Sequence, residues 1–269
     1  MQKNNLCLIK ELRNRTGIGI IECKKALFYT KNNLEQAIDY LRSAGVIKAE
    51  KKNINSTLEG LILIYQKNNN IAILELNCET DFVSKNIDFI NFGKKILDRI
   101  VCKNITDISD INIFFEKHRV DLISKFNENI NIRRIKLVQK KCSSYYLHRF
   151  RIGVIVSFDN MNSSINKEIM KNISMHIAAS KPKYIDASNI PQEVIQREYN
   201  IQLELTKKLN KNKLQEENII KGKMNKFINE ITLLNQIFIM NTKKTVKEIL
   251  KENNLKVLSF IRFELGEKI

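Results

Sequence analysis

Apolar residues recur at helical spacing in three short blocks over the first fifty residues. The first block places Leu6, Ile9 and Leu12 on one helical face, and the run 16–19 interrupts it. Two further blocks cover 21–27 and 34–41. Asn33, with a glutamine three residues later, is typical of a helix N-terminus. We therefore expect a three-helix module. Its third helix should end near Gly45, and the polar run 48–53 should form a linker.

From residue 58 the pattern changes to the continuous or alternating apolar runs of strands. The runs 61–65 and 71–76 flank three asparagines, which predicts a β-hairpin. A single helix is expected to begin at Thr80-Asp81 and to continue to Ile100. The later expected elements are a helix near 112–127, strands near 131–140, 143–149 and 152–158, and a helix over 164–179 before Pro182. Strand, strand, helix thus occurs twice, which suggests two related α+β subdomains.

The stretch 191–230 carries two apolar helical patterns separated by a polar break at 210–213. Two helices of similar length around such a break predict an antiparallel hairpin that protrudes from its domain. The alternating residues over 257–264 predict a final strand that returns to the second sheet. We therefore predict an α+β fold.

Composition supports a packed chain. Of 269 residues 43% are hydrophobic and 28% charged, which is too apolar for a disordered chain. No run of about 18 uncharged apolar residues occurs, so we expect no membrane span. The first residues lack the apolar core of a signal peptide, and we expect a cytoplasmic protein.

The net charge of +17 ordinarily points toward nucleic acid. Most of the 46 basic residues are lysines spread along the whole chain, however, and arginine is the better reader of phosphate and guanine. No RNA-binding aromatic motif or zinc finger is present. Nucleic acid is therefore not the expected partner, although a basic RNA-associated binding module stays open as the alternative function.

Catalytic and metal signals are weak. The five cysteines are far apart and odd in number, so we expect reduced and mostly buried thiols. The three histidines show no metal-ligand spacing, and we expect neither a metal site nor a cofactor. Cys23 beside Lys24 and Lys25 has the neighbours of an activated thiol, but its helical spacing places it in a core. We expect no enzyme.

The segment 77–83 is the most informative local sequence. One interpretation is structural: Thr80 caps a helix, Asp81 complements the helix dipole, and Phe82 packs inward. The other interpretation holds the Phe82 ring outward beside a carboxylate, at a rigid corner between a strand and a helix. That arrangement is a wedge for a partner.

Two motifs carry a family resemblance. The stretch 12–27, LRNRTGIGIIECKKAL, resembles the opening signature of bacterial elongation factor Ts, and 75–83, ELNCETDFV, is similar to a second motif of that family. Three further matches follow in the same order, at 128–134, 175–182 and 260–264. The resemblance covers about residues 6–267.

The resemblance implies a fold and a function. The implied domains are a ubiquitin-associated-like (UBA-like) helical domain at 1–54 and core subdomains at 55–140 and 141–269, with a coiled-coil hairpin at about 193–230. The implied function is guanine-nucleotide exchange on elongation factor Tu: the factor binds this GTPase and promotes GDP release by disturbing its Mg²⁺ and phosphate site. Dimerisation of the complex stays open.

The resemblance also implies residues that bind the partner. The wedge at the Mg²⁺ site would consist of Asp81 and Phe82 with Thr80 and Val83 beside them. Further positions that match the family's interface are Lys24, His148, Ile20 and Ile21. The alternative for Lys24 is a solvated charge on a helix face, and the alternative for His148 is a buried core histidine. The roles of Arg133 and Arg134 stay open between the interface and support of a strand.

Two departures from the family pattern stand out. Phe126-Asn127 replaces an aliphatic residue followed by glycine, which leaves the conformation of that loop open. The sequence ends at Ile269, whereas longer members continue into a C-terminal helix, and weaker partner binding or faster turnover of the complex is expected.

Overall fold

The structure is a computed structural model that describes residues 2–52, 55–160, 166–207 and 213–268. The chain divides into two compact units. The first comprises residues 1–139, 149–152 and 263–269, and the second comprises 140–148 and 153–262. Within the described ranges no helix is both long enough and apolar enough to cross a membrane. The α+β class is confirmed, whereas the domain boundaries at 54/55 and 140/141 stay predictions.

The first unit begins with the three expected helices, α1 (Gln2–Thr16), α2 (Ile20–Tyr29) and α3 (Leu34–Lys52). The Asn33 side chain accepts a hydrogen bond from the backbone N–H of Gln36 and so caps α3 as predicted. The predicted end near Gly45 is wrong, because α3 runs on through most of the expected linker to Lys52. Gly45 instead permits a close helix contact. A Cβ there would lie 2.3 Å from Oγ of Ser124 on α6 (Ile108–Phe126).

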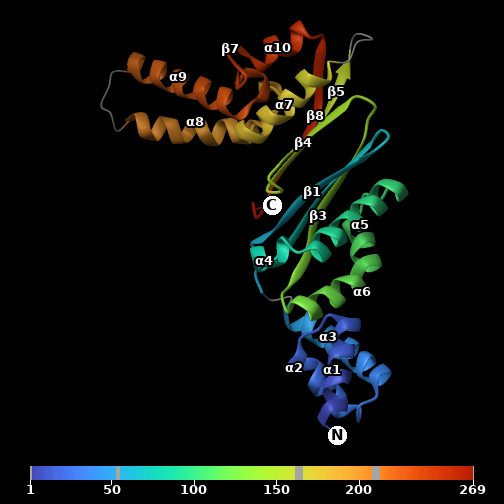
Figure 1. Cartoon of the computed structure of the whole chain (residues 1–269). Helices are drawn as coiled ribbons and strands as arrows, with labels where there is room; N and C mark the ends of the chain where they lie inside the picture. The colour runs from blue at the N-terminus through green and yellow to red at the C-terminus, as the bar shows by residue number, and fades with distance from the viewer. Residues whose placement is uncertain (1, 53–54, 161–165, 208–212, 269) are drawn as a thin grey trace. The chain divides into compact units, whose positions relative to one another are not determined.

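A three-stranded antiparallel sheet follows, with strand order β1 (Glu59–Lys67), β2 (Asn70–Cys78) and β3 (Ile130–Gln139). The predicted hairpin is confirmed, and Lys67 pairs with Asn70 across its turn. Helices α5 (Ile87–Lys103) and α6 pack on this sheet (Figure 1). The central strand β2 is buried from residue 71 to residue 78, so the core of the first unit lies between the sheet and these helices.

The single helix expected after Thr80 is two helices. Two residues separate the end of the one-turn helix α4 (Asp81–Ser84) from the start of α5 at Ile87. Asn86 has extended backbone angles, and its side chain accepts the N–H of Asp88, which starts a new helix. Asparagine competes with helical hydrogen bonding in this way, so it interrupts an apolar pattern that is otherwise continuous.

Helix α6 ends at Asn127, which has left-handed backbone angles with φ of 60°. The N–H of Asn127 donates to the carbonyl of Ile123. Asparagine tolerates this conformation better than most residues with a Cβ. Asn127 thus ends the helix in the conformation that glycine usually supplies, and this answers the question left open for the loop.

The second unit contains a three-stranded sheet with the strand order β4 (Ser143–His148), β5 (Ile152–Asn160) and β8 (Leu255–Glu264). Helix α7 (Lys167–Ser180) packs against β4. The final strand is therefore confirmed. Helix α7 ends two residues before Pro182. The first residues of the helix predicted there, 164 and 165, lie outside the described residues.

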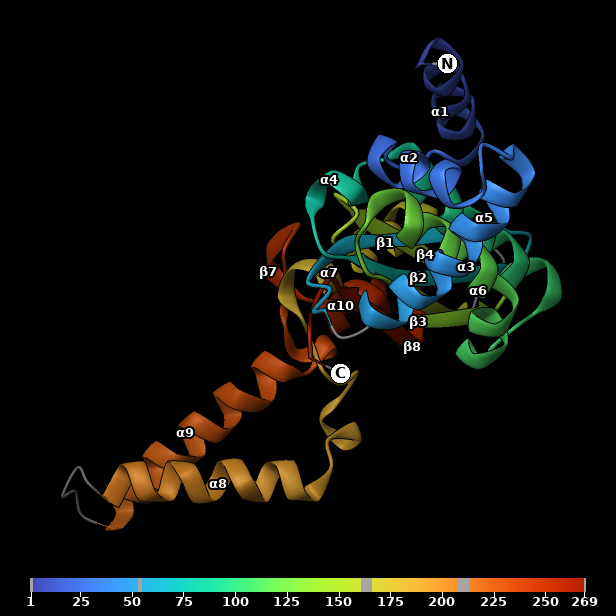
Figure 2. The same cartoon turned by 90° about the horizontal axis from the view of Figure 1, so that it is seen from below.

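Between α7 and β8 the chain forms the predicted antiparallel hairpin, α8 (Gln192–Lys207) and α9 (Lys213–Ile231), which extends from the rest of its unit (Figure 1, Figure 2). Most of the predicted break at 210–213 lies outside the described residues, and Lys213 already belongs to α9. The sequence pattern missed the small elements η1 (Ala187–Asn189), η2 (Leu233–Asn235), β6 (Ile237–Phe238), β7 (Asn241–Thr245) and α10 (Val246–Glu252).

Candidate functional site

The corner between β2 and α4 presents Phe82 to solvent. Its side chain is 83% exposed, whereas Val83 is only 6% exposed and belongs to the core. Successive residues of a helix point about 100° apart, so burial of Val83 leaves the preceding side chain outside. The interpretation in which Phe82 packs inward is therefore wrong. The outward arrangement is the one that the structure contains.

Hydrogen bonds from a distant segment hold this corner. The carboxylate of Glu128 accepts from the backbone N–H of Thr80 at 2.9 Å and from its hydroxyl at 2.6 Å. The buried thiol of Cys78 donates to the carbonyl of Thr80 at 3.1 Å. The predicted side-chain cap is wrong, because the Thr80 hydroxyl donates to Glu128 and makes no cap bond to α4. Thr80 instead connects the corner to the loop after α6.

A second carboxylate fixes the same loop. Glu79 Oε1 accepts from the backbone N–H of Asn129 at 2.7 Å and from the side chain of Asn55 at 3.0 Å. Burial raises the pKa of Glu79, but these hydrogen bonds and the charge of Lys52 outweigh it and hold the pKa below its ordinary value. The base of the corner is therefore fixed on two sides, and Phe82 stands on a rigid support.

Asp81 lies beside the exposed ring and is itself half exposed. Lys85 Nζ approaches its Oδ2 to 2.6 Å. The hydrogen bond and the charge of Lys85 hold the pKa of Asp81 below its ordinary value. The corner therefore presents a carboxylate next to an apolar ring.

The expected positions on α2 share one exposed face. Ile20 and Ile21 are 53% and 69% exposed, and Lys24 follows one turn later on the same side. The opposite face is buried and consists of Cys23, Ala26 and Leu27. Because this buried face packs inside the three-helix module, the exposed face of α2 can contact a partner.

The thiol interpretation of Cys23 is not supported. Cys23 is fully buried, and burial raises its pKa, the reverse of what activation requires. The expectation that most of the thiols are buried is wrong, since only Cys23 and Cys78 are buried, Cys142 is half-buried, and Cys7 and Cys102 are exposed. Among the described residues no group of three or more His, Cys, Asp or Glu side chains could hold a metal ion.

His148 is the predicted site residue that belongs to the second unit. It is exposed at the end of β4, and Tyr146 Oη lies 3.0 Å from its Nδ1. The alternative that it is a buried core histidine is wrong. That description fits His176, which is fully buried on α7.

Arg133 and Arg134 have partners inside the first unit. Glu75 on β2 is fully buried and binds Arg133 at 2.7 Å and Arg134 at 2.5 Å. Consecutive strand residues normally point to opposite faces, but the register of β2 and β3 shifts at Glu75/Leu76. Such a bulge sets two residues against one, so both arginines reach one carboxylate. This geometry favours support of the strand for these two residues.

Sequence reasoning missed the partners that hold the corner, and the signal was present. Glu128 and Asn129 were part of a matched motif but had no assigned role. Ile87 was missed as well. It is 61% exposed and begins the helix directly after α4. Its apolar character at a helical spacing suggested a core residue, and only the break at Asn86 turns it outward.

Comparisons with known proteins match this chain over nearly its whole length. The family model described as elongation factor TS matches residues 79–267, and the UBA/TS-N domain model matches residues 21–41. The elongation factor Ts of Buchnera aphidicola from Acyrthosiphon pisum (strain APS) is 53% identical over 262 residues, which cover 97% of this chain and 96% of that protein.

More distant relatives agree. The elongation factor Ts of Photorhabdus laumondii is 45% identical, with 97% of this chain and 92% of that protein covered. The elongation factor Ts of Cronobacter sakazakii is 43% identical, with coverage of 97% and 91%. The RNA-associated alternative receives no support from these matches. The chain belongs to the elongation factor Ts family.

Proposed function

We propose that this chain is the guanine-nucleotide exchange factor of elongation factor Tu in translation elongation. We further propose that the Phe82 side chain is the main group that disturbs the Mg²⁺ and phosphate site of the partner. The observation that carries the proposal is an 83% exposed phenylalanine on a corner fixed by Glu128 and Glu79. An exposed ring on a rigid support can bury itself in a partner without an ordering cost. The role assigns no covalent chemistry to the chain, and it places the chain in the cytoplasm, where translation takes place.

The mechanism follows from how a GTPase holds GDP. Backbone amides and a lysine surround the phosphates, and Mg²⁺ requires nearly ideal octahedral geometry. In the family the Asp-Phe pair, here Asp81 and Phe82, enters between two helices of the GTPase next to the Mg²⁺ site. Burial of the Phe82 ring supplies roughly 1.5 to 3 kcal/mol. That free energy displaces the helices and weakens the hold on metal and phosphate.

Other exposed residues would extend the contact. Ile20, Ile21 and Lys24 form the free face of α2, and His148 is exposed on the second unit. Thr80 and Val83 support the wedge from behind and contribute through its position. By linkage, GDP weakens the binding of this chain to its partner by the same factor by which the chain weakens GDP.

The test is release of fluorescent GDP from elongation factor Tu, measured by stopped flow with Phe82→Ala. Loss of the ring's burial should slow stimulated release by about 10- to 150-fold. The matched control is Phe114→Ala, which removes another exposed ring of the same unit, 48% exposed on α6. Phe82→Ala should unfold at nearly the same urea concentration as the parent chain, because its ring is 83% exposed. Phe114→Ala also removes contacts with Arg99 and Phe115 and should cost about 1 kcal/mol, so a fall in release rate for Phe82→Ala alone is not an effect of stability. Equal release rates for Phe82→Ala and the parent chain would reject the wedge.

A further inference from the structure

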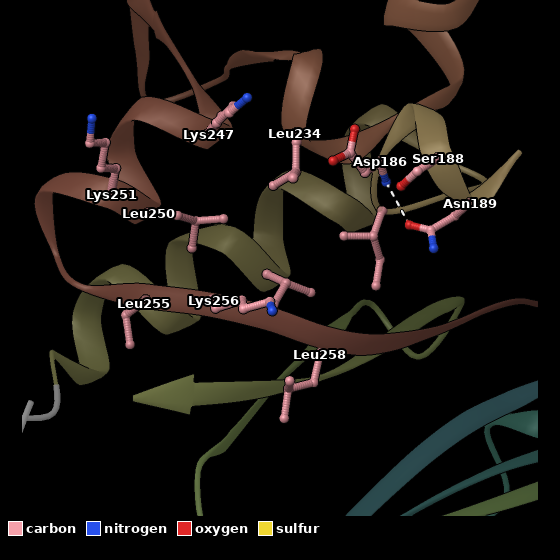
Figure 3. A pocket seen from close by; sticks show the side chains of 12 residues that line it. Asp186, Ser188, Asn189, Leu234, Lys247, Leu250, Lys251, Leu255, Lys256 and Leu258 are labelled. Carbon is pink, nitrogen blue, oxygen red and sulfur yellow. Dashed lines mark hydrogen bonds between the residues drawn. The ribbon is translucent and has the colours of Figure 1, made fainter. Parts of the chain in front are cut away.

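The second unit contains a groove that the exchange proposal does not use. It has a volume of about 620 Å³ and is lined by residues of η1, η2, α10 and the first half of β8. Figure 3 shows Lys247 and Lys251 on α10 at one side and Asp186, Ser188 and Asn189 at the other, with β8 running past both. Apolar side chains line the space between these two sides, including Leu234 and Leu250.

The groove runs along the edge of a sheet. In the strand order β4-β5-β8, β8 is the last strand, so among the described residues one of its sides has no neighbouring strand. Four consecutive residues of β8, 255–258, line the groove. Because side chains alternate across a strand, a space lined by four consecutive residues follows the strand's edge rather than one of its faces. Such an edge presents backbone N–H and C=O groups to an added strand.

The charge of the groove is one-sided. Lys247, Lys251 and Lys256 are exposed on its lining, and no ion pair joins them to a carboxylate within the described part of the chain. The carboxylate of Asp186, which also lines the groove, accepts the N–H of Ala187 at 2.6 Å and caps η1. By contrast Lys244, just outside the lining, pairs with Glu252 at 2.6 Å. The groove therefore favours a negatively charged occupant.

We propose that this groove binds an extended acidic segment of a partner protein, which adds to the sheet as a fourth strand beside β8. Backbone hydrogen bonds to the strand's edge supply affinity, and alternate side chains supply specificity. One set of side chains is apolar and packs on Leu234, Leu250 and Val257. The other set is acidic and meets Lys247, Lys251 and Lys256. Such binding is independent of the wedge at Phe82, which lies in the other unit.

The test uses the whole chain and a synthetic probe. The probe is an eight-residue peptide that alternates glutamate with valine or leucine and carries a fluorophore at its N-terminus. Fluorescence anisotropy at physiological salt should give saturable binding to the parent chain, and hydrogen exchange should show added protection of backbone amides at 255–258. A triple variant, Lys247→Glu, Lys251→Glu and Lys256→Glu, should weaken binding at least about tenfold.

Two controls separate the groove from general basic charge. Lys171→Glu, Lys221→Glu and Lys243→Glu reverse three exposed lysines of the same unit that do not line the groove, and this variant should change the affinity by less than about threefold. A probe with the same side chains but N-methyl groups on alternate amides cannot donate to a strand edge. It should bind at least about tenfold more weakly than the parent probe.

Three results would overturn the proposal. Equal weakening by both triple variants would assign binding to overall charge. Equal affinity of the methylated and parent probes would exclude an added strand. If the parent chain showed no saturable binding, the three lysines would only protect the edge of β8 from pairing with other chains. None of these results depends on elongation factor Tu, so they are separate from failure of the exchange test.

Discussion

The two sheets of this molecule have the same succession of strands but are held by different chemistry. In each unit a hairpin is followed by a covering helix, and a third strand joins the second strand of the hairpin. In the first unit the buried Glu75 binds two arginines and the N–H of Gly266 at 3.0 Å. In the second, buried His176 donates from Nε2 to Gln236 at 2.9 Å and accepts the N–H of Ile239 on Nδ1.

The difference teaches that one topology accepts either a charged or a neutral buried centre, provided that each polar atom has a partner. The two centres should then fail under different conditions. Removal of a single charge should affect the first unit, because the remaining charges stay partly buried. A fall in pH should affect the second unit, because its imidazole is held in the neutral form.

The largest effect is expected from Glu75→Gln. Arg133 loses its charged partner, and Arg134 keeps only the partly exposed Glu267 at 2.8 Å. Breaking a buried pair from one side costs about 3 to 5 kcal/mol. Urea denaturation measures the loss. The control is Glu59→Gln, the same chemical change at the more exposed Arg151–Glu59 pair, which should cost at most about 1 kcal/mol. If Glu75→Gln and Glu59→Gln lowered the free energy of unfolding equally, burial of the Glu75 carboxylate would have no special role.

A smaller effect is expected from pH. Burial lowers the pKa of His176 from 6.5, and the hydrogen bond with Gln236 offsets only part of this. Below pH 6.5 the unfolded chain therefore binds a proton that the native second unit does not bind. Its free energy of unfolding should fall by up to about 1.4 kcal/mol per pH unit below that point, and the contribution should be constant above it.

Hydrogen exchange resolved by residue measures this effect separately in each unit. Amides of α7 should lose protection between pH 6.5 and 5.5 relative to those of α5, after correction for the intrinsic exchange rate. His176→Gln should remove the difference. If α5 and α7 responded equally in the parent chain, the neutral centre would not be the pH-sensitive one.

The smallest effect concerns how the covering helices end. Both α6 and α7 end at a left-handed residue, Asn127 with φ of 60° and Lys181 with φ of 49°. Lysine pays more than asparagine for this conformation. Lys181→Gly should therefore be more stable than Lys181→Ala by about 1 kcal/mol in thermal unfolding. Asn127→Gly should stay within a few tenths of the parent chain. This account would be contradicted if the stability difference between Lys181→Gly and Lys181→Ala were smaller than the stability change caused by Asn127→Gly.

Much of the fold could be predicted because its signals are local. The three N-terminal helices, the hairpin at Asn68–Asn70 and the final strand follow from spacing and turn residues alone. The break at Asn86 was missed because apolar spacing continues through it. The elements β6, β7 and α10 were missed because they are too short to show a period.

The candidate site was less predictable, because exposure is a tertiary property. The pattern around Phe82 fits a buried ring as well as an exposed one, and the choice depends on Val83 and on the Glu128 contact from 48 residues away. The joint contact of Arg133 and Arg134 with Glu75 depends on a bulge that no alternation rule reveals. The family resemblance supplied the residues of the corner, but their arrangement required the structure.

The position of Gly266 has a consequence for how the first unit is completed during synthesis. Its N–H contacts Glu75 across 191 positions of sequence, and the whole second unit is inserted between the two. The first unit therefore cannot close its buried carboxylate until every residue of the second unit has been synthesised. A chain cut before residue 263 would contain the whole second unit but would lack the segment that satisfies Glu75 in the first.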